Sequence, residues 1–369
     1  MPEGSAWHRG NAYNRRTGCG KTARPGLYGG CRVTGIPTVE AAYQGKTKEH
    51  YMKGHFSFGG IGALPGAKAT GFFHVPGTSI AMPLTVINGV ATGPTLLVTA
   101  GMHGGEYPSI EAAMRFAAEL VPTEVSGQVV VIPLVSPSAF LARQEYTLPE
   151  DGKNLNRQFP GNPAGTVAER MAFALMTEAA TKASAWVDLH GGDIHETLVP
   201  IGGYESDAAP SIGEQARAMI EVFGVEYAAR TYSLPGTALH TATTAGIPSI
   251  LAEAGQQGRR DAADTMLLLR GCRNVAQLLG LLPGALLPGS RPRMLKRIDW
   301  VRAEHRGCRY PAVTLRERIE QGHIIGRIKD YFGNVVTEYR APQSGIVVLS
   351  CTSFAVREQH MLVGVGIPA

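Results

Sequence analysis

The chain has 369 residues, of which 44% are hydrophobic and 18% charged, so it is long enough for two globular domains with buried cores. No run of about 18 apolar residues occurs, which excludes a transmembrane helix, and the N-terminus lacks the apolar stretch of a secretory signal. The five cysteines are odd in number, far apart and without a CxxC pair, which argues against a disulfide framework or a cysteine zinc site. We therefore expect a cytoplasmic protein with no membrane partner.

The net charge of +5 is concentrated in the N-terminal segment. Residues 1–53 carry nine Lys or Arg against three Asp or Glu, whereas the rest of the chain has 26 against 27. This basic, Gly-rich segment shows little periodicity, so we predict that it is poorly ordered; a nucleic-acid-binding arm is the alternative. Residues 291–318 are also basic but lack an aromatic stacking pattern, so we expect a solvated face and no nucleic-acid partner.

Short apolar runs alternate along the chain with helical patterns. The runs are typical of strands buried on both faces of a sheet and span residues 94–100, 129–135, 186–190 and 248–253. Helices are predicted over residues 107–120 and 260–282. Two more are predicted from capping boxes: one begins at Thr166 and Glu169 and ends at about Lys182, and the other begins at Ser211 and Glu214 and ends at Gly224. This order predicts an α/β fold with a mixed, largely parallel sheet sandwiched by helices.

A change of pattern follows the last predicted helix. Residues 283–292 contain three prolines and two glycines, which is typical of a linker. Short β-type runs separated by turns fill 319–369. We therefore predict an α/β catalytic domain over 54–290 and a small all-β domain over 291–369.

The candidate metal ligands follow two of the predicted strands. His103 and Glu106 form an HxxE pair directly after the first strand, and His190 ends a later one before two glycines. The carboxyl ends of parallel strands gather at one edge of a sheet, and two histidines with one carboxylate suit an open catalytic zinc site. The donors also suit other divalent ions.

Three further positions carry polar groups suited to hydrolysis of an amide. Glu253 closes an apolar strand, where a carboxylate is costly unless it faces a polar cleft, so it is the candidate general base. Arg157 and Asn156 lie in a turn-rich loop and could hold a carboxylate, and Arg143 could reach a carbonyl oxygen. If Glu253 is not the base, Asp193 and Glu196 are the next candidates.

A GxSxG elbow and a GxGxxG loop are both absent, which disfavours serine hydrolases and dinucleotide enzymes.

Taken in order, these motifs resemble the succinylglutamate desuccinylase/aspartoacylase family of the zinc carboxypeptidase superfamily. The motifs are HGGE, DGKNLNRQFPG, DLHGG and ILAEAG, and the likeness runs from about residue 66 to the C-terminus. It is strongest to bacterial deacylases of small N-acylated amino acids. The C-terminal β domain is also a family feature.

The resemblance implies a role for each candidate residue. It implies one zinc ion per chain at His103, Glu106 and His190, and the general base at Glu253. It further implies polarisation of the scissile carbonyl by Arg143 and binding of the substrate carboxylate by Asn156 and Arg157.

Two positions depart from the family pattern. Many relatives have HGDE where this chain has Gly105, so an acid beside the metal ligands is missing and metal affinity could differ. The usual Asn-Pro ahead of the first arginine is Ser136-Pro137 here.

The expected activity is hydrolysis of a small N-acyl amino acid or related amide by zinc-activated water with a glutamate base. A carboxypeptidase is the alternative among enzymes, and a metal-binding or ligand-binding relative without catalysis is the alternative from another class. The resemblance leaves a homo-oligomer open and does not name the acyl group or the amine.

Overall fold

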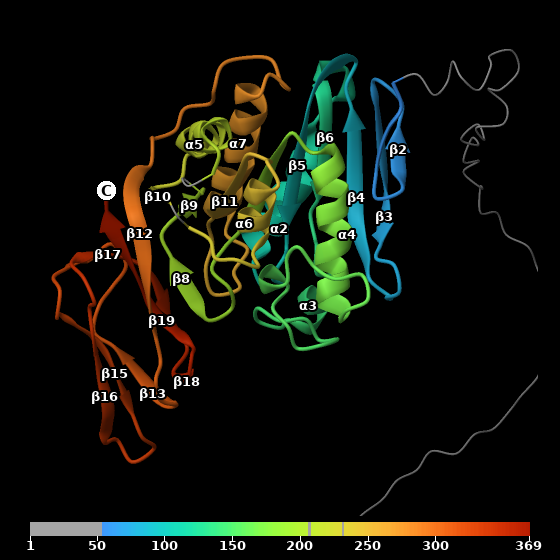
Figure 1. The fold of residues 1–369 in the computed structure, drawn as a ribbon. Coiled ribbons are helices and arrows are strands. Elements are labelled where there is room, and N and C mark those ends of the chain that lie inside the picture. Colours follow the sequence, from blue (N-terminus) through green and yellow to red (C-terminus); the bar gives the residue numbers. More distant parts are fainter. Residues whose placement is uncertain (1–53, 206–207, 231) are drawn as a thin grey trace, which may run out of the picture. The chain divides into compact units, whose positions relative to one another are not determined.

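The computed structural model describes residues 54–205, 208–230 and 232–369 (Figure 1). The prediction for residues 1–53 therefore lies outside the described part of the chain. The helices are α2 (Tyr107–Glu119), η2 (Pro122–Glu124), α3 (Pro137–Ala142), η3 (Leu155–Arg157), α4 (Val167–Lys182), α5 (Pro210–Phe223), α6 (Ala238–Thr244) and α7 (Ala262–Leu278). None of the helices in these ranges is long and apolar enough to cross a membrane.

The strands divide between one large sheet and two small ones. The small sheets are β1 (Phe56–Phe58) with β2 (Ile61–Ala63), and β16 (Val335–Arg340), β15 (Ile324–Lys329), β13 (Gly307–Pro311) and β18 (Ala355–Val356) in that order. The large sheet runs in the order β14 (Arg318–Ile319), β17 (Gly345–Cys351), β19 (Met361–Pro368), β12 (Arg293–Arg302), β10 (Tyr227–Ala229), β9 (Ile201–Gly203), β11 (Ser249–Glu253), β7 (Ala185–His190), β5 (Ala91–Ala100), β6 (Ser126–Ile132), β4 (Ala81–Asn88) and β3 (Ala67–His74), with β8 (Glu196–Leu198) paired to β17.

Two blocks of parallel strands form the middle of the large sheet, joined by the antiparallel pair of β9 and β11, and antiparallel pairs extend the sheet at both edges. Strands β11, β7, β5 and β6 are parallel neighbours, as are β9, β10 and β12. The outer strands β3, β4, β17 and β19 pair in the antiparallel sense. The predicted α/β fold on a mixed sheet is confirmed.

Two hydrophobic cores lie on opposite faces of this sheet. Along β7, Val187 belongs to the core under α2, α5 and α7, whereas Trp186 belongs to the core under α4 and α6. Successive side chains of a strand point to opposite faces, so a strand buried on both sides must be apolar at nearly every position. This is why the strands appeared in the sequence as unbroken apolar runs.

The predicted helix ends are largely reproduced. Helix α4 begins after Thr166, whose N–H donates to the Glu169 carboxylate at 2.7 Å, and Gly224 ends α5 in the left-handed region at φ 97°. The second capping box is wrong, because α5 begins at Pro210 and Ser211 lies inside its first turn. Proline is favoured at the first position of a helix, since its fixed φ is already helical and its missing N–H is not needed there.

The C-terminal strands continue the large sheet. The segment between Leu278 and Arg293 contains no helix or strand, in keeping with the predicted linker. After it, β12 pairs in parallel with β10 and in antiparallel with β19. The division into domains at residue 290 stays a prediction, but backbone hydrogen bonds cross it and fix the C-terminal strands to the edge of the α/β sheet.

Candidate active site

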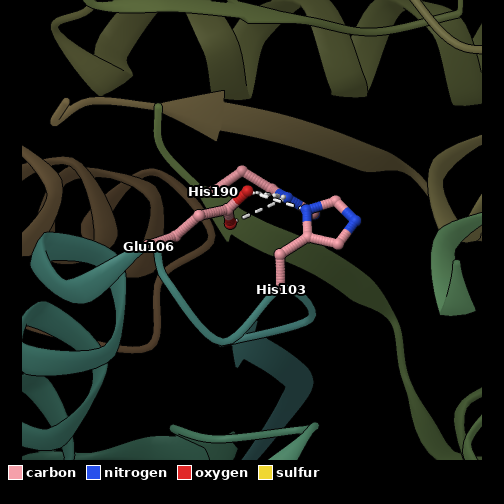
Figure 2. A group of neighbouring side chains, drawn as sticks. All are labelled: His103, Glu106 and His190. Carbon is pink, nitrogen blue, oxygen red and sulfur yellow. Dashed lines mark hydrogen bonds and ion pairs between the residues drawn. The ribbon is translucent and has the colours of Figure 1, made fainter. Parts of the chain in front are cut away.

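The three candidate metal ligands come together at the carboxyl edge of two adjacent strands (Figure 2). His103 follows β5, Glu106 is the residue before α2, and His190 is the last residue of β7. Because β5 and β7 are parallel and in register at Ala100 and Leu189, their ends reach the same point. The predicted cluster therefore follows from the pairing of two strands.

Both imidazoles present the same ring nitrogen to the Glu106 carboxylate. His103 Nδ1 lies 2.7 Å from Glu106 Oε1, and His190 Nδ1 lies 3.1 Å from Glu106 Oε2. One ligand atom from each of the three residues lies within 4.8 Å of the others. All three side chains are buried, so the group is arranged to surround a small ion away from bulk water.

The other nitrogen of each imidazole has a partner of its own. His190 Nε2 lies 3.1 Å from Asp188 Oδ2, and His103 Nε2 lies 3.2 Å from Asn154 Oδ1. The Thr99 hydroxyl in turn donates to Asp188 Oδ1 at 2.6 Å. Such partners orient histidine ligands and fix the tautomer whose remaining nitrogen faces the metal. The chain thus has the donors and the supporting contacts that a divalent ion requires.

The charges within the group also fit a cation. Burial opposes ionisation, but the charges of His190 and His103 hold the pKa of Glu106 down at about 2. Burial by itself lowers the pKa of a histidine, but the charge of Glu106 outweighs this and raises the pKa of both His103 and His190. Glu106 Oε2 is buried, lies 3.1 Å from His190 Nδ1, and forms no well-oriented hydrogen bond in the described part of the chain. A buried carboxylate placed between two imidazoles is the environment that a divalent ion stabilises.

A cavity of about 310 Å³ opens beside this group and contains the candidate base. The register of β11 and β7 pairs Glu253 with His190, and Tyr232 donates its hydroxyl to Glu253 Oε1 at 2.7 Å. Burial raises the pKa of Glu253 to about 7. A carboxyl with a pKa near neutrality can both accept and return a proton.

The predicted carboxylate-binding residues line the same cavity. Asn156 is buried, and its Oδ1 accepts from the N–H of Ala238 at 2.9 Å, which leaves the side-chain NH₂ as a donor. Arg157 is an exposed residue of the cavity lining; partial loss of water around its guanidinium inside the cavity, followed by the charge of Arg302, lowers its pKa. Six of the seven predicted site residues therefore surround one space: His103, Glu106, Asn156, Arg157, His190 and Glu253.

Comparison with known proteins gives the family. Residues 92–279 match the model of the succinylglutamate desuccinylase/aspartoacylase catalytic domain. The chain belongs to this family. The N-alpha-acetyl-L-2,4-diaminobutyric acid deacetylase of Halomonas elongata is 30% identical over 279 residues, which are 73% of this chain and 80% of that protein.

Two solved structures share the fold of this chain. The product-bound ectoine utilization protein of Ruegeria pomeroyi is 26% identical with a TM-score of 0.73, over 82% of this chain and 95% of the other. A family protein from Rhodobacter sphaeroides gives the same identity and TM-score, over 82% and 96%.

Arg143 is the predicted site residue of this family member that the structure does not bring to the cavity. It follows the last residue of α3 in the left-handed region at φ 53°, and its N–H bonds back to the carbonyls of Ala139 and Phe140. Its side chain is exposed and is not part of the cavity lining. The role that the resemblance implies for Arg143 therefore stays a prediction without support from the described geometry.

The acid expected to be missing at Gly105 is supplied from elsewhere. A Cβ at Gly105 would collide with Asp193 Oδ1, so the absence of a side chain makes room for that carboxylate. Asp193 is fully buried and accepts from the backbone N–H groups of Ile194 and Tyr146 at 2.7 and 3.1 Å. The site of this family member thus keeps an acid beside the metal ligands, contributed by the loop after β7.

Several lining residues were not found from the sequence. Tyr232 lies in a loop before α6, and Trp300, Arg302 and Arg357 come from the C-terminal strands and the loop that joins them. No motif marked these residues. Their position depends on the pairing of β12 with β10, which joins segments about 70 residues apart. Only a signal for that pairing could have placed them at the cavity.

Proposed function

We propose that this chain is a zinc-dependent hydrolase that cleaves the amide bond of a small N-acylated amino acid. The observation that carries the proposal is the position of Glu253 beside the His103, Glu106 and His190 group in one small cavity. Family membership supports the same reading, since relatives carry the names of a deacetylase and a desuccinylase. A cavity of about 310 Å³ suits a ligand of this size.

The proposed mechanism assigns the proton transfers to Glu253. A divalent ion held by the two histidines and Glu106 would supply Lewis-acid chemistry. Glu253 accepts a proton from the attacking water and delivers it to the nitrogen of the departing amine, so that acid and amine leave as the C–N bond breaks. The hydroxyl of Tyr232 holds the Glu253 carboxyl in place at 2.7 Å.

Substrate orientation is assigned to the loop that contains η3. The guanidinium of Arg157 binds the substrate carboxylate through charge-assisted hydrogen bonds, and the Asn156 amide donates beside it. Asn154 orders this loop, because its Oδ1 accepts from the N–H of Asn156 at 2.9 Å and also contacts His103. One short segment therefore carries the carboxylate anchor and also contacts the metal ligand His103.

The test is a screen of the zinc-supplemented protein against N-acetyl, N-succinyl and longer N-acyl amino acids, with a panel of peptides alongside. Release of a free amino acid and a short acid supports the proposal. Release of C-terminal residues from peptides would instead support a carboxypeptidase. If one zinc ion binds per chain and neither panel is cleaved, the protein is a binding relative without catalysis.

A further inference from the structure

A second cavity, of about 490 Å³, is lined by residues of β8, β13 and β17 and of the loops after β13 and β17. It shares no lining residue with the cavity of the candidate active site. Glu196 of β8 lines the active-site cavity, whereas the next residue, Thr197, lines this one. Because successive side chains of a strand point to opposite faces, β8 separates two distinct cavities. We call the second one the Arg309 pocket.

Arg309 of β13 brings a buried positive charge to this pocket. The residue is 6% exposed and belongs to the pocket lining. Its Nη1 donates to the carbonyl of Cys351 at 2.5 Å, and its Nη2 donates to the Ser350 hydroxyl and the Leu362 carbonyl at 3.0 and 3.1 Å. These contacts hold the guanidinium in place, but every acceptor among them is neutral.

The charge of Arg309 has no counter-charge in the protein. Among the described residues, no carboxylate oxygen lies within 4.0 Å of its guanidinium. Burial lowers the pKa of Arg309, and the Cys351 thiol acts on it in the opposite direction. That thiol stays neutral, since burial raises its own pKa. A buried charge is costly without a partner of opposite sign, so an anion in the pocket would stabilise it.

The pocket also offers a free donor and an apolar wall. A guanidinium carries five N–H groups, and Nε of Arg309 donates to no acceptor in the described ranges of the chain. Thr352, an exposed residue of the lining, adds a hydroxyl. The apolar side chains of the lining include Val313, Leu315 and Phe354. Polar donors among apolar side chains fit a small organic ligand whose charged group is negative.

We propose that the Arg309 pocket is a second ligand site, which binds a small carboxylate with a short apolar chain. Nε of Arg309 donates to the carboxylate, and the Thr352 hydroxyl donates beside it. The apolar wall contacts the chain of the ligand. The site is separate from the candidate active site, and its test measures binding, so the result does not depend on whether any amide is cleaved.

Titration calorimetry of the zinc-supplemented full chain with butyrate measures this binding. Butylammonium carries the same chain with the opposite charge, and inorganic phosphate is an anion without a chain. We expect butyrate to bind more tightly than either comparison ligand by about tenfold or more. Binding of phosphate or butylammonium that equals the binding of butyrate would overturn the assigned class of ligand.

Variants distinguish the Arg309 pocket from the active-site cavity, where Arg157 is a second candidate carboxylate ligand. Arg309→Gln should weaken the binding of one butyrate per chain about tenfold or more, and Arg157→Gln should leave that binding event unchanged. Arg327→Gln is the matched control, because Arg327 of β15 is paired with Glu338 at 2.9 Å and lies outside the pocket lining. Parental binding in Arg309→Gln, or an equal loss in Arg327→Gln, would overturn the site.

A second variant keeps the proposal testable if Arg309→Gln does not fold. Thr352→Trp fills the pocket from an exposed position and leaves the hydrogen bonds of Arg309 in place. Circular dichroism and the melting temperature show whether this variant folds as the parent does. Loss of one butyrate-binding event in the folded Thr352→Trp protein supports the site, and butyrate binding of parental strength and stoichiometry would contradict it.

Discussion

His103 and His190 each use one ring nitrogen for a partner inside the protein and present the other to Glu106. Asp188 and Asn154 hold the outer nitrogens at 3.1 and 3.2 Å, so both rings are oriented before a metal arrives. Preorganised ligands bind a metal more tightly. When one of the three ligands is removed, the two that remain are too few to hold the ion against competition from water.

His103→Ala and His190→Ala should therefore each empty the metal site, with zinc falling from about one ion per chain to near zero. Elemental analysis of the purified, zinc-dialysed variants measures this directly. His74→Ala is the matched control, because His74 is an exposed histidine of β3. Unchanged zinc content in either variant would contradict the assignment of that histidine as a metal ligand.

Arg157 and Arg143 should respond differently to truncation. Arg157→Ala removes a charged contact to the substrate carboxylate and should raise KM by about 10–100-fold, with a smaller change in kcat. Arg143→Ala should leave both constants near the parental values, because Arg143 does not line the cavity. Steady-state kinetics on the best N-acyl amino acid decide the point. A large fall in kcat for Arg143→Ala would instead support the carbonyl-polarising role that the resemblance implies.

At the level of secondary structure, strand register brings the catalytic groups together. The parallel pairing of β11 with β7 sets Glu253 beside His190, and β8 carries Glu196 to the same cavity through its pairing with β17. Glu196 is buried and accepts from the N–H of Asp193 at 3.1 Å. One short strand thus supplies a second carboxyl group that the proposed mechanism does not use.

The pH dependence of stability should report on Glu196. Its pKa is raised by burial from 4.5 to about 8, so the folded state favours the neutral acid and loses stability as pH rises from about 4.5 through about 8. Glu196→Gln cannot ionise and should remove part of this loss, up to about 5 kcal/mol at pH 9 and little at pH 4. Urea unfolding of the metal-free protein at both pH values measures the difference.

The matched control for this experiment is Glu304→Gln, an exposed glutamate between β12 and β13. It should shift neither curve. A Glu196→Gln protein whose stability falls with pH as steeply as the parent would show that Glu196 ionises freely in the folded state.

For the whole molecule, local patterns predicted the middle of the fold better than its edges. The buried strands and the helices between them follow from apolar runs and end signals. His190 was found because it ends such a strand, and His103 and Glu106 because they closely follow one. The entry of β12 into the large sheet could not be predicted, because it depends on contacts between distant segments. The same holds for Asp193 beside Gly105 and for Arg302 and Arg357 at the cavity. Arg143 is the opposite case: the order of motifs along the sequence predicted it at the site, but its side chain does not line the cavity.

Metal should stabilise the entire fold, because its ligands come from separate segments of one sheet and the site is absent from the unfolded chain. Saturation at 100 times the dissociation constant adds about 2.7 kcal/mol. The Tm of the zinc-loaded protein should therefore exceed that of the chelator-treated protein by several degrees in calorimetry. His190→Ala should show no such difference. Equal Tm values with and without zinc in the parent would contradict a structural link between site and fold.

The proposed hydrolysis depends most directly on Glu253. Glu253→Gln keeps the size of the side chain and an oxygen to accept from Tyr232 but cannot accept a proton from water. With zinc content equal to that of the parent, kcat for the best N-acyl amino acid should fall about 10²–10⁴-fold, while KM changes little. Hydrolysis at near the parental rate by zinc-loaded Glu253→Gln would contradict the account, and the base would then have to be sought at Asp193 or Glu196.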